Sequence, residues 1–434
     1  MVDLQTLYRI FLKHPEITTD SRKIIKNAIF FALKGERFDG NEYAGQALKD
    51  GCAYAVIDNP AFFTGNQHLI LVTNVLKTLQ NLARYHRQQF EIPVLAITGT
   101  NGKTTTKELI TRILQKSFRV VATSGNLNNH IGVPLTLLKA TADTEFIVVE
   151  MGANHPGEIA ALCDLAMPVS GMITNIGKAH LEGFGNIQNV AHAKAELFHY
   201  LRKNKGTIFY NRDNPRLKSL IHPDDRSVTY GTMNYPGNKF TGPADNPFLS
   251  FIWHAKTGDL EVKTKMYGRY NFENFMAAIS VGVFYGIRPQ KIIEAVESYV
   301  PDNARSQIIE TGKNHVILDA YNANPSSVEL ALREFLTLTN DPKAIILGDM
   351  FELGRNEEEE HRRILNLLLN QCTHGEKVIV IGKVFNSLAG NTPFSHFPDN
   401  ESAKEYFDIN PLHGYSILIK GSRGMAMESL LPLF

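Results

Sequence analysis

Apolar residues in the middle of the chain form short continuous runs separated by helical patterns. The runs lie within 93–98, 146–153, 171–177 and 207–211, and the helical patterns cover 103–118, 158–166 and 187–203. Continuous β-branched runs without polar alternation suit parallel strands that are buried on both faces. This order of elements predicts a central domain with a doubly wound parallel sheet, which we place at residues 89–302.

The two ends of the chain repeat the alternation of strand and helix. Residues 1–88 contain strand-like runs at 52–58 and 68–74 and a helical pattern from Val75 to Phe90, which predicts a small α/β domain. A second α/β domain is expected over 303–434, where strand-like runs recur at 315–321, 344–349, 377–382 and 416–421. Residues 222–267 are rich in Pro, Gly, Asn and Asp, and we interpret them as hairpins on the edge of the central domain.

Composition and charge exclude several classes of protein. The 434 residues contain 45 Lys and Arg against 44 Asp and Glu, so no basic excess predicts nucleic-acid binding. No apolar run reaches the roughly 18 residues of a membrane span, and no signal peptide is apparent. The cysteines Cys52, Cys163 and Cys372 lie far apart, which is typical of reduced thiols in a cytoplasmic protein.

Residues 98–105, TGTNGKTT, follow a strand and open a helix. Backbone N–H groups at a helix N-terminus bind phosphate, Lys103 can reach the terminal phosphates, and the Thr104 hydroxyl can bind Mg²⁺. The string departs from the usual phosphate-loop pattern, because Ile97 stands where the first Gly would be. ATP is the expected nucleotide, although the motif alone leaves GTP open. The predicted nucleotide-binding residues of this loop are Gly99, Thr100, Asn101, Gly102, Lys103, Thr104 and Thr105.

Three further side chains could serve chemistry near this loop. Glu150 ends a strand, and ligands bind at the carboxyl ends of parallel strands, so Glu150 is a candidate Mg²⁺ ligand or only the cap of the next helix. His180 follows the end of another strand and is a candidate metal ligand or a structural histidine. Lys194 lies in a predicted helix, where a solvated lysine is the ordinary interpretation. If buried, its neutral amine could instead add CO₂.

Longer strings extend the pattern over most of the chain. They are TGTNGKTTTKE (98–108), GNLNNHIGVPLTLL (125–138), EMGANHPGEI (150–159), TNIGKAHLEGFG (174–185), AKAELF (193–198), DAYNANPSSVELAL (319–332), LGDMFELG (347–354) and KGSRGMAME (420–428). With these strings the chain resembles the Mur ligases from about residue 18 to residue 429. Within the family it is most similar to the enzymes that add D-alanyl-D-alanine in peptidoglycan synthesis.

The resemblance implies a three-domain ligase. The N-terminal domain would bind the UDP-sugar, the central one ATP, and the C-terminal one would be Rossmann-like. The implied reaction joins UDP-N-acetylmuramoyl-tripeptide to D-alanyl-D-alanine through an acyl phosphate, in the cytoplasm and as a monomer. ATP and two Mg²⁺ ions are implied, with Thr104 and Glu150 at one ion and His180 and a carbamylated Lys194 at the other.

The resemblance also assigns residues residue by residue. Asn271 and Asn274 match an adenine-contacting segment, although Tyr270 stands where the family usually has His. Arg305 would contact a phosphate and Asp319 the ribose, unless Asp319 only caps a helix. The implied substrate-binding residues are Ser21, Arg22, Lys34 and Gly35 for UDP, together with Asn128, Tyr321, Asn322 and Asn324.

Other functions remain open from the sequence. They are a MurE-like ligase or folylpolyglutamate synthetase on the same scaffold, a kinase, and a nucleotide-binding scaffold without activity. The string DNPR at 213–216 resembles a MurE motif but lies in the wrong domain, so we interpret it as a strand-to-helix turn with proline near the first helical position. Whether the tripeptide ends in diaminopimelate or lysine is left open. Closure of the domains around the substrates is expected, because the ATP-site residues come from two domains.

Overall fold

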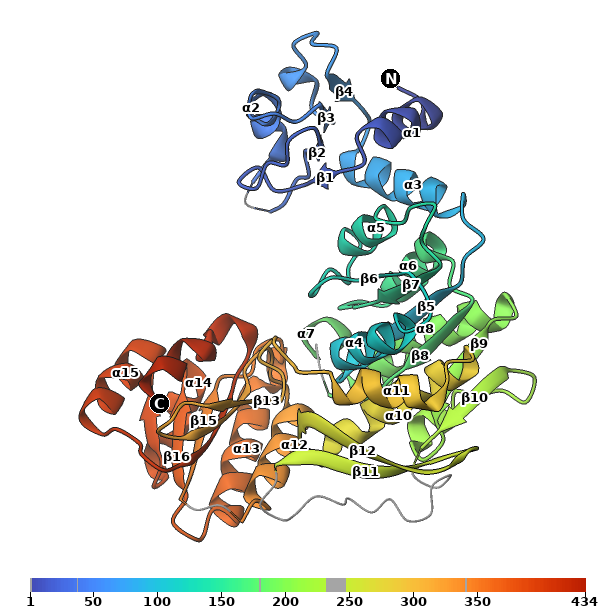
Figure 1. Ribbon diagram of the computed structural model, residues 1–434. Helices are drawn as coiled ribbons and strands as arrows, with labels where there is room; N and C mark the ends of the chain where they lie inside the picture. Colours follow the sequence, from blue (N-terminus) through green and yellow to red (C-terminus); the bar gives the residue numbers. More distant parts are fainter. Residues whose placement is uncertain (1, 37, 179–180, 232–246, 340–341) are drawn as a thin grey trace.

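The computed structural model describes residues 2–36, 38–178, 181–231, 247–339 and 342–434. Three bodies, each built on a parallel or mostly parallel sheet, follow one another along the chain (Figure 1). The expected α/β class with three such units is confirmed. None of the helices in these residues has the length and apolar character needed to cross a membrane.

The N-terminal body has a four-stranded parallel sheet in the order β1-β2-β3-β4. Its elements are α1 (Leu4–Lys13), β1 (Ile17–Thr18), β2 (Ile29–Phe31), α2 (Ala44–Lys49), β3 (Tyr54–Ile57), β4 (Leu69–Leu71) and α3 (Val75–Arg87). Helix α3 begins where Asn74 accepts a hydrogen bond from the Lys77 N–H. The two strands and the helix expected near here are confirmed, and α3 leads directly to the next body.

The central body has a six-stranded parallel sheet in the order β10-β9-β8-β5-β7-β6. Its strands are β5 (Val94–Thr98), β6 (Val120–Ala122), β7 (Phe146–Glu150), β8 (Ser170–Ile173), β9 (Thr207–Asn211) and β10 (Arg226–Tyr230). Its helices are α4 (Lys103–Leu114), α5 (Gly132–Leu137), α6 (Glu158–Ala166), α7 (Leu181–Phe184), α8 (Ile187–Lys203), α9 (Pro215–Lys218), α10 (Phe272–Phe284) and α11 (Pro289–Glu297). Helix α9 begins at Pro215, as expected for the DNPR turn.

Successive residues of β5 are buried on opposite faces of the central sheet. Val94 and Ala96 pack in one core with α5, α6 and α8, whereas Leu95 and Ile97 pack in another with α4, α10 and α11. Burial on both faces explains why residues 94–97 of this strand are all apolar. The carboxyl end of β5, where the phosphate loop begins, therefore sits between two layers of helices.

The prediction for residues 222–267 was only partly right. A hairpin is present, because β11 (Phe248–Ala255) pairs antiparallel with β12 (Gly258–Tyr267). Residues Arg226–Tyr230, however, form β10, which extends the main sheet by pairing parallel with β9. Most side chains of β10 are not buried, so an apolar run could not mark it in the sequence. Residues 232–246 lie outside the described part.

The C-terminal body has a six-stranded sheet in the order β13-β14-β18-β15-β16-β17, in which β13 alone among these strands is antiparallel to its neighbour. The strands are β13 (Gln307–Glu310), β14 (His315–Asp319), β15 (Lys343–Gly348), β16 (Lys377–Ile381), β17 (Ser395–Phe397) and β18 (Ser416–Lys420). The helices are α12 (Pro325–Leu336), α13 (Glu357–Gln371), α14 (Lys383–Leu388) and α15 (Asn400–Ile409). The four strands expected from apolar runs are confirmed. The short strands β13 and β17 were not predicted, because their side chains are only partly buried.

A buried arginine ties the N-terminal body to the central one. Arg87, at the end of α3, donates from Nε to the Ala166 carbonyl at 3.1 Å. Its two other nitrogens donate to the carbonyls of Phe90 at 2.6 Å and Ile92 at 3.0 Å. All three carbonyls belong to segments that enter or cover the central sheet. The guanidinium therefore joins α3 to the end of α6.

Substituting Arg87→Ala is expected to lower the free energy of unfolding by about 2–4 kcal/mol, because partly buried carbonyls lose their donors. Urea unfolding measures this change, and the fluorescence of Trp253, which is the one tryptophan and is buried in the central body, reports it. Arg84→Ala, on the exposed side of α3, serves as the matched control and should change the midpoint little. Equal midpoints for the Arg87 variant and the parent protein would contradict the prediction.

Candidate active site

The loop between β5 and α4 is held in a shape that requires glycine. Gly102 has φ of 77°, and a Cβ there would lie 2.4 Å from Oδ1 of Asn274. The residue before it is also held in place, because the Asn101 N–H donates to Oδ1 of Asn175 at 2.9 Å. The first N–H groups of α4 are therefore presented to a cavity as a phosphate-binding loop requires.

Lys103 is the first residue of α4 and lines this cavity. Its Nζ donates to the carbonyls of Gly99 at 2.8 Å and Thr100 at 3.0 Å, so the side chain folds over its own loop. Burial lowers the pKa of Lys103, Glu150 opposes the shift, and the charge of Arg305 adds to it. No carboxylate among the described residues forms an ion pair with its amine. An incoming anion would therefore meet an amine that Glu150 influences at a distance but that no described carboxylate contacts.

Glu150, at the end of β7, is 1% exposed and has one carboxylate oxygen in use. Oε1 accepts from the Thr104 hydroxyl at 3.2 Å and from Nδ2 of Asn128 at 2.8 Å. Oε2 is buried and has no hydrogen-bond partner within the described ranges. A buried carboxylate oxygen without a partner, beside a threonine hydroxyl, fits a hard divalent cation such as Mg²⁺.

Lys194 is buried in α8, with 2% of its surface exposed, and it lines the same cavity. The interpretation as a solvated helix lysine was therefore wrong, because this face of α8 turns inward toward the sheet. Burial, helped by the charge of Lys103, lowers the pKa of Lys194 well below its ordinary value. The neutral amine is consequently favoured.

His180 lies outside the described residues, so its place relative to Glu150 and Lys194 stays a prediction. Within the described ranges, no three His, Cys, Asp or Glu side chains gather as a metal site would require. Among the described residues, Glu150 is therefore the carboxylate that could hold a cation beside Thr104.

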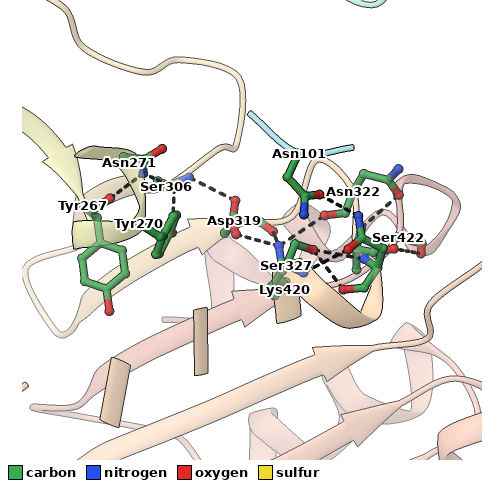
Figure 2. Close-up of polar contacts among 12 residues, drawn as sticks. Asn101, Tyr267, Tyr270, Asn271, Ser306, Asp319, Asn322, Ser327, Lys420 and Ser422 are labelled. Atoms are coloured by element: carbon green, nitrogen blue, oxygen red, sulfur yellow. Dashed lines mark hydrogen bonds and ion pairs between the residues drawn. The ribbon is translucent and has the colours of Figure 1, made fainter. Parts of the chain in front are cut away.

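Two buried asparagines form the wall of the cavity beyond the loop. Nδ2 of Asn274 donates to Oδ1 of Asn271 at 2.8 Å, and Asn274 Oδ1 accepts from the Thr106 hydroxyl at 3.1 Å. Nδ2 of Asn271 donates to the Tyr267 carbonyl at 2.8 Å (Figure 2). The neighbouring Tyr270 also lines the cavity. The structure thus brings the expected adenine-binding segment to the phosphate loop.

The C-terminal body supplies Asp319, at the end of β14, and its position is set by two bonds (Figure 2). Oδ2 lies 2.6 Å from Nζ of Lys420, and Oδ1 accepts from the Ser306 N–H at 3.2 Å. Lys420 is 2% exposed and was not among the predicted site residues. Its presence in the string KGSRGMAME was the available signal. Asp319 does not cap a helix here, so that alternative is not supported.

The segment after β14 contacts the phosphate loop directly. Asn324 caps α12 through the Ser327 N–H, and its Nδ2 donates to Oδ1 of Asn101 at 2.7 Å. Two guanidinium groups lie near the ring of Tyr321, with the Arg305 carbon 3.7 Å and the Arg423 carbon 5.4 Å from the ring centroid. Arg423, like Lys420, was missed by the sequence reasoning.

One cavity of about 1000 Å³ connects these groups. Its walls include α3, the phosphate loop, Glu150, Lys194 and the C-terminal segments around Asp319 and Tyr321. Of the predicted residues, Thr100, Asn101, Gly102, Thr104, Thr105, Asn128, Asn271, Asn274, Arg305, Asn322 and Asn324 also line it. Gly99 does not line the cavity, but its carbonyl accepts from Lys103.

The four residues expected to bind UDP lie elsewhere. Arg22 pairs with Asp20 at 2.9 Å, and Lys34 lies 3.7 Å from Asp39. Ser21 and Gly35 adjoin them in the N-terminal body, and none of the four lines the cavity. The structure therefore groups most residues expected at the ATP site in one cavity and leaves the expected UDP site apart from it.

Known families cover nearly all of this architecture. The Mur ligase family catalytic domain matches residues 15–96, the Mur ligase middle domain matches 97–282, and the Mur ligase glutamate ligase domain matches 304–423. The UDP-N-acetylmuramoyl-tripeptide–D-alanyl-D-alanine ligase of Bacillus subtilis (strain 168) is 33% identical over 426 residues, covering 96% of this chain and 92% of the relative. The chain belongs to the Mur ligase family.

Solved Mur ligases share the whole fold. MurF from Acinetobacter baumannii matches with a TM-score of 0.84 at 28% identity, covering 96% of this chain and 92% of that one. MurF from Thermotoga maritima in complex with ADP matches with a TM-score of 0.84 at 25% identity, covering 100% and 98%. The resemblance to the D-alanyl-D-alanine-adding branch is confirmed, and the chain is an ATP-dependent ligase. A kinase and an inactive nucleotide-binding scaffold are thereby set aside.

Proposed function

We propose that this Mur ligase joins D-alanyl-D-alanine to UDP-N-acetylmuramoyl-tripeptide at the expense of ATP. The full-length similarity to ligases of that name carries the proposal. The cavity supports it, because Lys103, Glu150 and Lys194 of the central body meet Arg305 and Asp319 there. A ligase that must exclude water from an activated acyl group needs such a joint site.

The proposed reaction has two steps. A terminal carboxylate oxygen of the tripeptide attacks the γ-phosphorus of ATP, the bond to the bridging oxygen breaks, and ADP leaves with an acyl phosphate as product. The amine of D-alanyl-D-alanine then attacks the acyl carbon, phosphate leaves, and the nitrogen loses a proton. Lys103 and Arg305 stabilise the negative charge on the transferring phosphoryl group, which is the main task of a protein in such a transfer.

Oxygen and nitrogen donors near the loop are assigned to two Mg²⁺ ions. Thr104 and Glu150 would hold one Mg²⁺ ion, and His180 with a carbamylated Lys194 would hold or orient the second. Mg²⁺, when bound, neutralises phosphate oxygens and so favours attack by an anionic carboxylate. The lone Oε2 of Glu150 and the buried amine of Lys194 support these assignments.

The remaining residues are assigned to substrates. Asn271 and Asn274 would contact adenine and Asp319 the ribose, because each Asp319 carboxylate oxygen can still accept from a hydroxyl beside its present bond. Ser21, Arg22, Lys34 and Gly35 would bind UDP. Tyr321, Asn322 and Asn324 would orient the dipeptide, and Asn128 would act near the acyl group through Glu150.

The domain boundaries, the compartment and the oligomeric state complete the proposal. The domains would run over 1–88, 89–302 and 303–434, with the boundaries before β5 and after α11. The enzyme would act as a cytoplasmic monomer. Free cysteines at positions 52, 163 and 372 agree with a reducing compartment.

Phosphate release tests the proposal. Purified protein with Mg-ATP is given UDP-N-acetylmuramoyl-tripeptide and D-alanyl-D-alanine, and each substrate is omitted in turn. Release that needs both substrates is the expected result, and the two tripeptides, with diaminopimelate or lysine, are then compared. Release with single L-amino acids but not with the dipeptide would instead favour a MurE-like or folate-like ligase.

Closure of the domains gives a second measurable expectation. The assigned UDP residues lie outside the cavity that holds the ATP residues, and the N-terminal body stands apart from the C-terminal one (Figure 1). An ATP analogue added together with UDP-N-acetylmuramoyl-tripeptide should therefore lower the radius of gyration measured by X-ray scattering. Each ligand alone is the control. An unchanged scattering curve with both ligands would contradict closure.

A further inference from the structure

The segment that joins α11 to β13, residues 299–306, has an unusual backbone. Ala304 has φ of 53° and Ser306 has φ of 48°, a region that side chains other than glycine rarely adopt. Arg305 stands between them. A conformation of this kind persists only where surrounding contacts hold it.

One end of this linker is held by Glu108. The Tyr299 hydroxyl donates to Oε2 of Glu108 at 2.6 Å, and Nδ2 of Asn303 lies 3.1 Å from each of its carboxylate oxygens. Glu108 belongs to α4, one turn beyond Lys103 and Thr104 at the start of that helix. The linker is thus fastened to the helix whose N-terminus forms the phosphate loop.

The other end is held by Ser306 (Figure 2). Its hydroxyl lies 2.8 Å from the Tyr270 hydroxyl and accepts from Nδ2 of Asn271 at 3.1 Å, both in the central body. Its N–H donates to Oδ1 of Asp319 in the C-terminal body at 3.2 Å. Tyr270, which departs from the usual histidine, therefore contacts the linker in this chain.

Hydrogen bonds therefore hold the linker on both sides of Arg305, and Arg305 lines the cavity. Its guanidinium stacks on Tyr321, and its Nε is buried without a hydrogen-bond partner in the described part of the chain. The local backbone does not favour this position of Arg305, because the φ angles of Ala304 and Ser306 on either side are unfavourable. The bonds to Glu108 and Ser306 supply the constraint.

We propose that Glu108 is a positioning residue, which acts through Tyr299 and Asn303 to place Arg305 against the phosphoryl group being transferred. This inference rests on the phosphate role proposed for Arg305. Glu108 and Lys103 both belong to α4. The bonds from Glu108 to Tyr299 and Asn303, here called the clamp, therefore keep Arg305 at a fixed position relative to the phosphate loop when the domains move. Glu108 does not itself line the cavity.

Kinetics of the full-length ligase test this role. Glu108→Gln keeps the side-chain shape but removes one acceptor, and it is expected to lower kcat roughly 10-fold to 100-fold, since small displacements of a positioned group have effects of this size. The KM for ATP should stay within about twofold, because the phosphate loop is untouched. Tyr299→Phe removes a single hydrogen bond and should lower kcat less. A thermal melt of each variant verifies that it is folded.

A double-mutant cycle separates positioning from general stabilisation. Arg305→Ala alone should lower kcat roughly 100-fold to 1000-fold. In that background Glu108→Gln should have no further effect, because the group it positions is gone. Glu294→Gln, which loses a surface ion pair with Lys116 at 3.3 Å, is the matched control and should be neutral in both backgrounds. Additive losses, or an unchanged kcat in Glu108→Gln, would overturn the inference.

Hydrogen exchange makes the test independent of turnover. Glu108→Gln should speed exchange of the Ser306 amide and of the Tyr321 amide, which donates to the Ala304 carbonyl at 3.1 Å. Unchanged exchange would overturn the clamp even if the parent protein shows no ligase activity. Absence of turnover in the parent protein contradicts the proposed function instead, and a fully active Arg305→Ala variant contradicts the role of Arg305. The failures are therefore distinguishable.

Discussion

Lys103→Ala is expected to lower kcat by about 10³-fold or more, the scale found when a charge that stabilises a transferring phosphoryl group is removed. In the described part of the chain, the Lys103 amine donates to the carbonyls of Gly99 and Thr100 in its own loop. Carbonyl oxygens solvate the amine but do not neutralise it. The γ-phosphate would therefore meet a cationic group at this point, and Lys103 is the one cationic side chain of α4 that lines the cavity.

The measurement is phosphate release under saturating substrates, with nucleotide affinity determined separately by titration calorimetry. Lys103→Arg should remain far below the parent activity, because a planar guanidinium does not fit where the amine folds between two carbonyls. Arg112→Ala, an exposed position further along α4, is the control and should keep the parent rate. A Lys103→Ala variant within tenfold of the parent kcat would show that the loop does not act on the γ-phosphate.

Lys194→Ala is expected to lower kcat by about 10²-fold to 10³-fold, if a carbamate on its amine supplies an anion to the reaction centre. Carbamate formation joins the neutral amine nitrogen to the carbon of CO₂ and releases one proton. Burial supplies that neutral amine, because it lowers the pKa of Lys194 well below the ordinary value. The group should be stable above the lowered pKa and be lost as the pH falls through it, when protonation blocks reaction with CO₂.

Carbon-13 NMR of protein equilibrated with labelled bicarbonate measures the modification directly. A carbamate resonance is expected in the parent protein and should be missing in Lys194→Ala. Lys203→Ala, at the exposed end of the same helix, is the matched control for both resonance and rate. A Lys194→Ala variant with full activity, or a resonance that survives the substitution, would contradict the assignment.

The sequence predicted the strands well where they are buried on both faces of a sheet. Strands such as Val94–Thr98 and Phe146–Glu150 are buried on both faces, so all their residues except the last, Thr98 and Glu150, are apolar and the run is conspicuous. The strand Arg226–Tyr230 escaped prediction because it pairs at a sheet edge through its backbone and leaves most of its side chains uncovered. Backbone pairing of that kind leaves no hydrophobic pattern.

The candidate site was readable only in part. The expected phosphate loop is local, since its glycines, its lysine and the helix that follows are adjacent in the chain, and the structure places this helix directly after Gly102. Lys194 could not be distinguished from a solvated lysine, because the face of α8 that turns inward depends on the sheet beneath it. Lys420 was overlooked for a similar reason, as its partner Asp319 lies about a hundred residues away.

By itself, then, the sequence determined the α/β class, the phosphate loop and, through its long strings, the Mur ligase family. The class and the loop follow from residues close together in the chain, and the family follows from similarity along the whole sequence. Only the tertiary structure decided which charges are buried together, such as Glu150 with its lone oxygen and Lys194 with its lowered pKa. It also decided that Glu108 holds the linker of Arg305. Burial and hydrogen bonding between distant segments arise when sheets and helices pack, and no local pattern of residues encodes them.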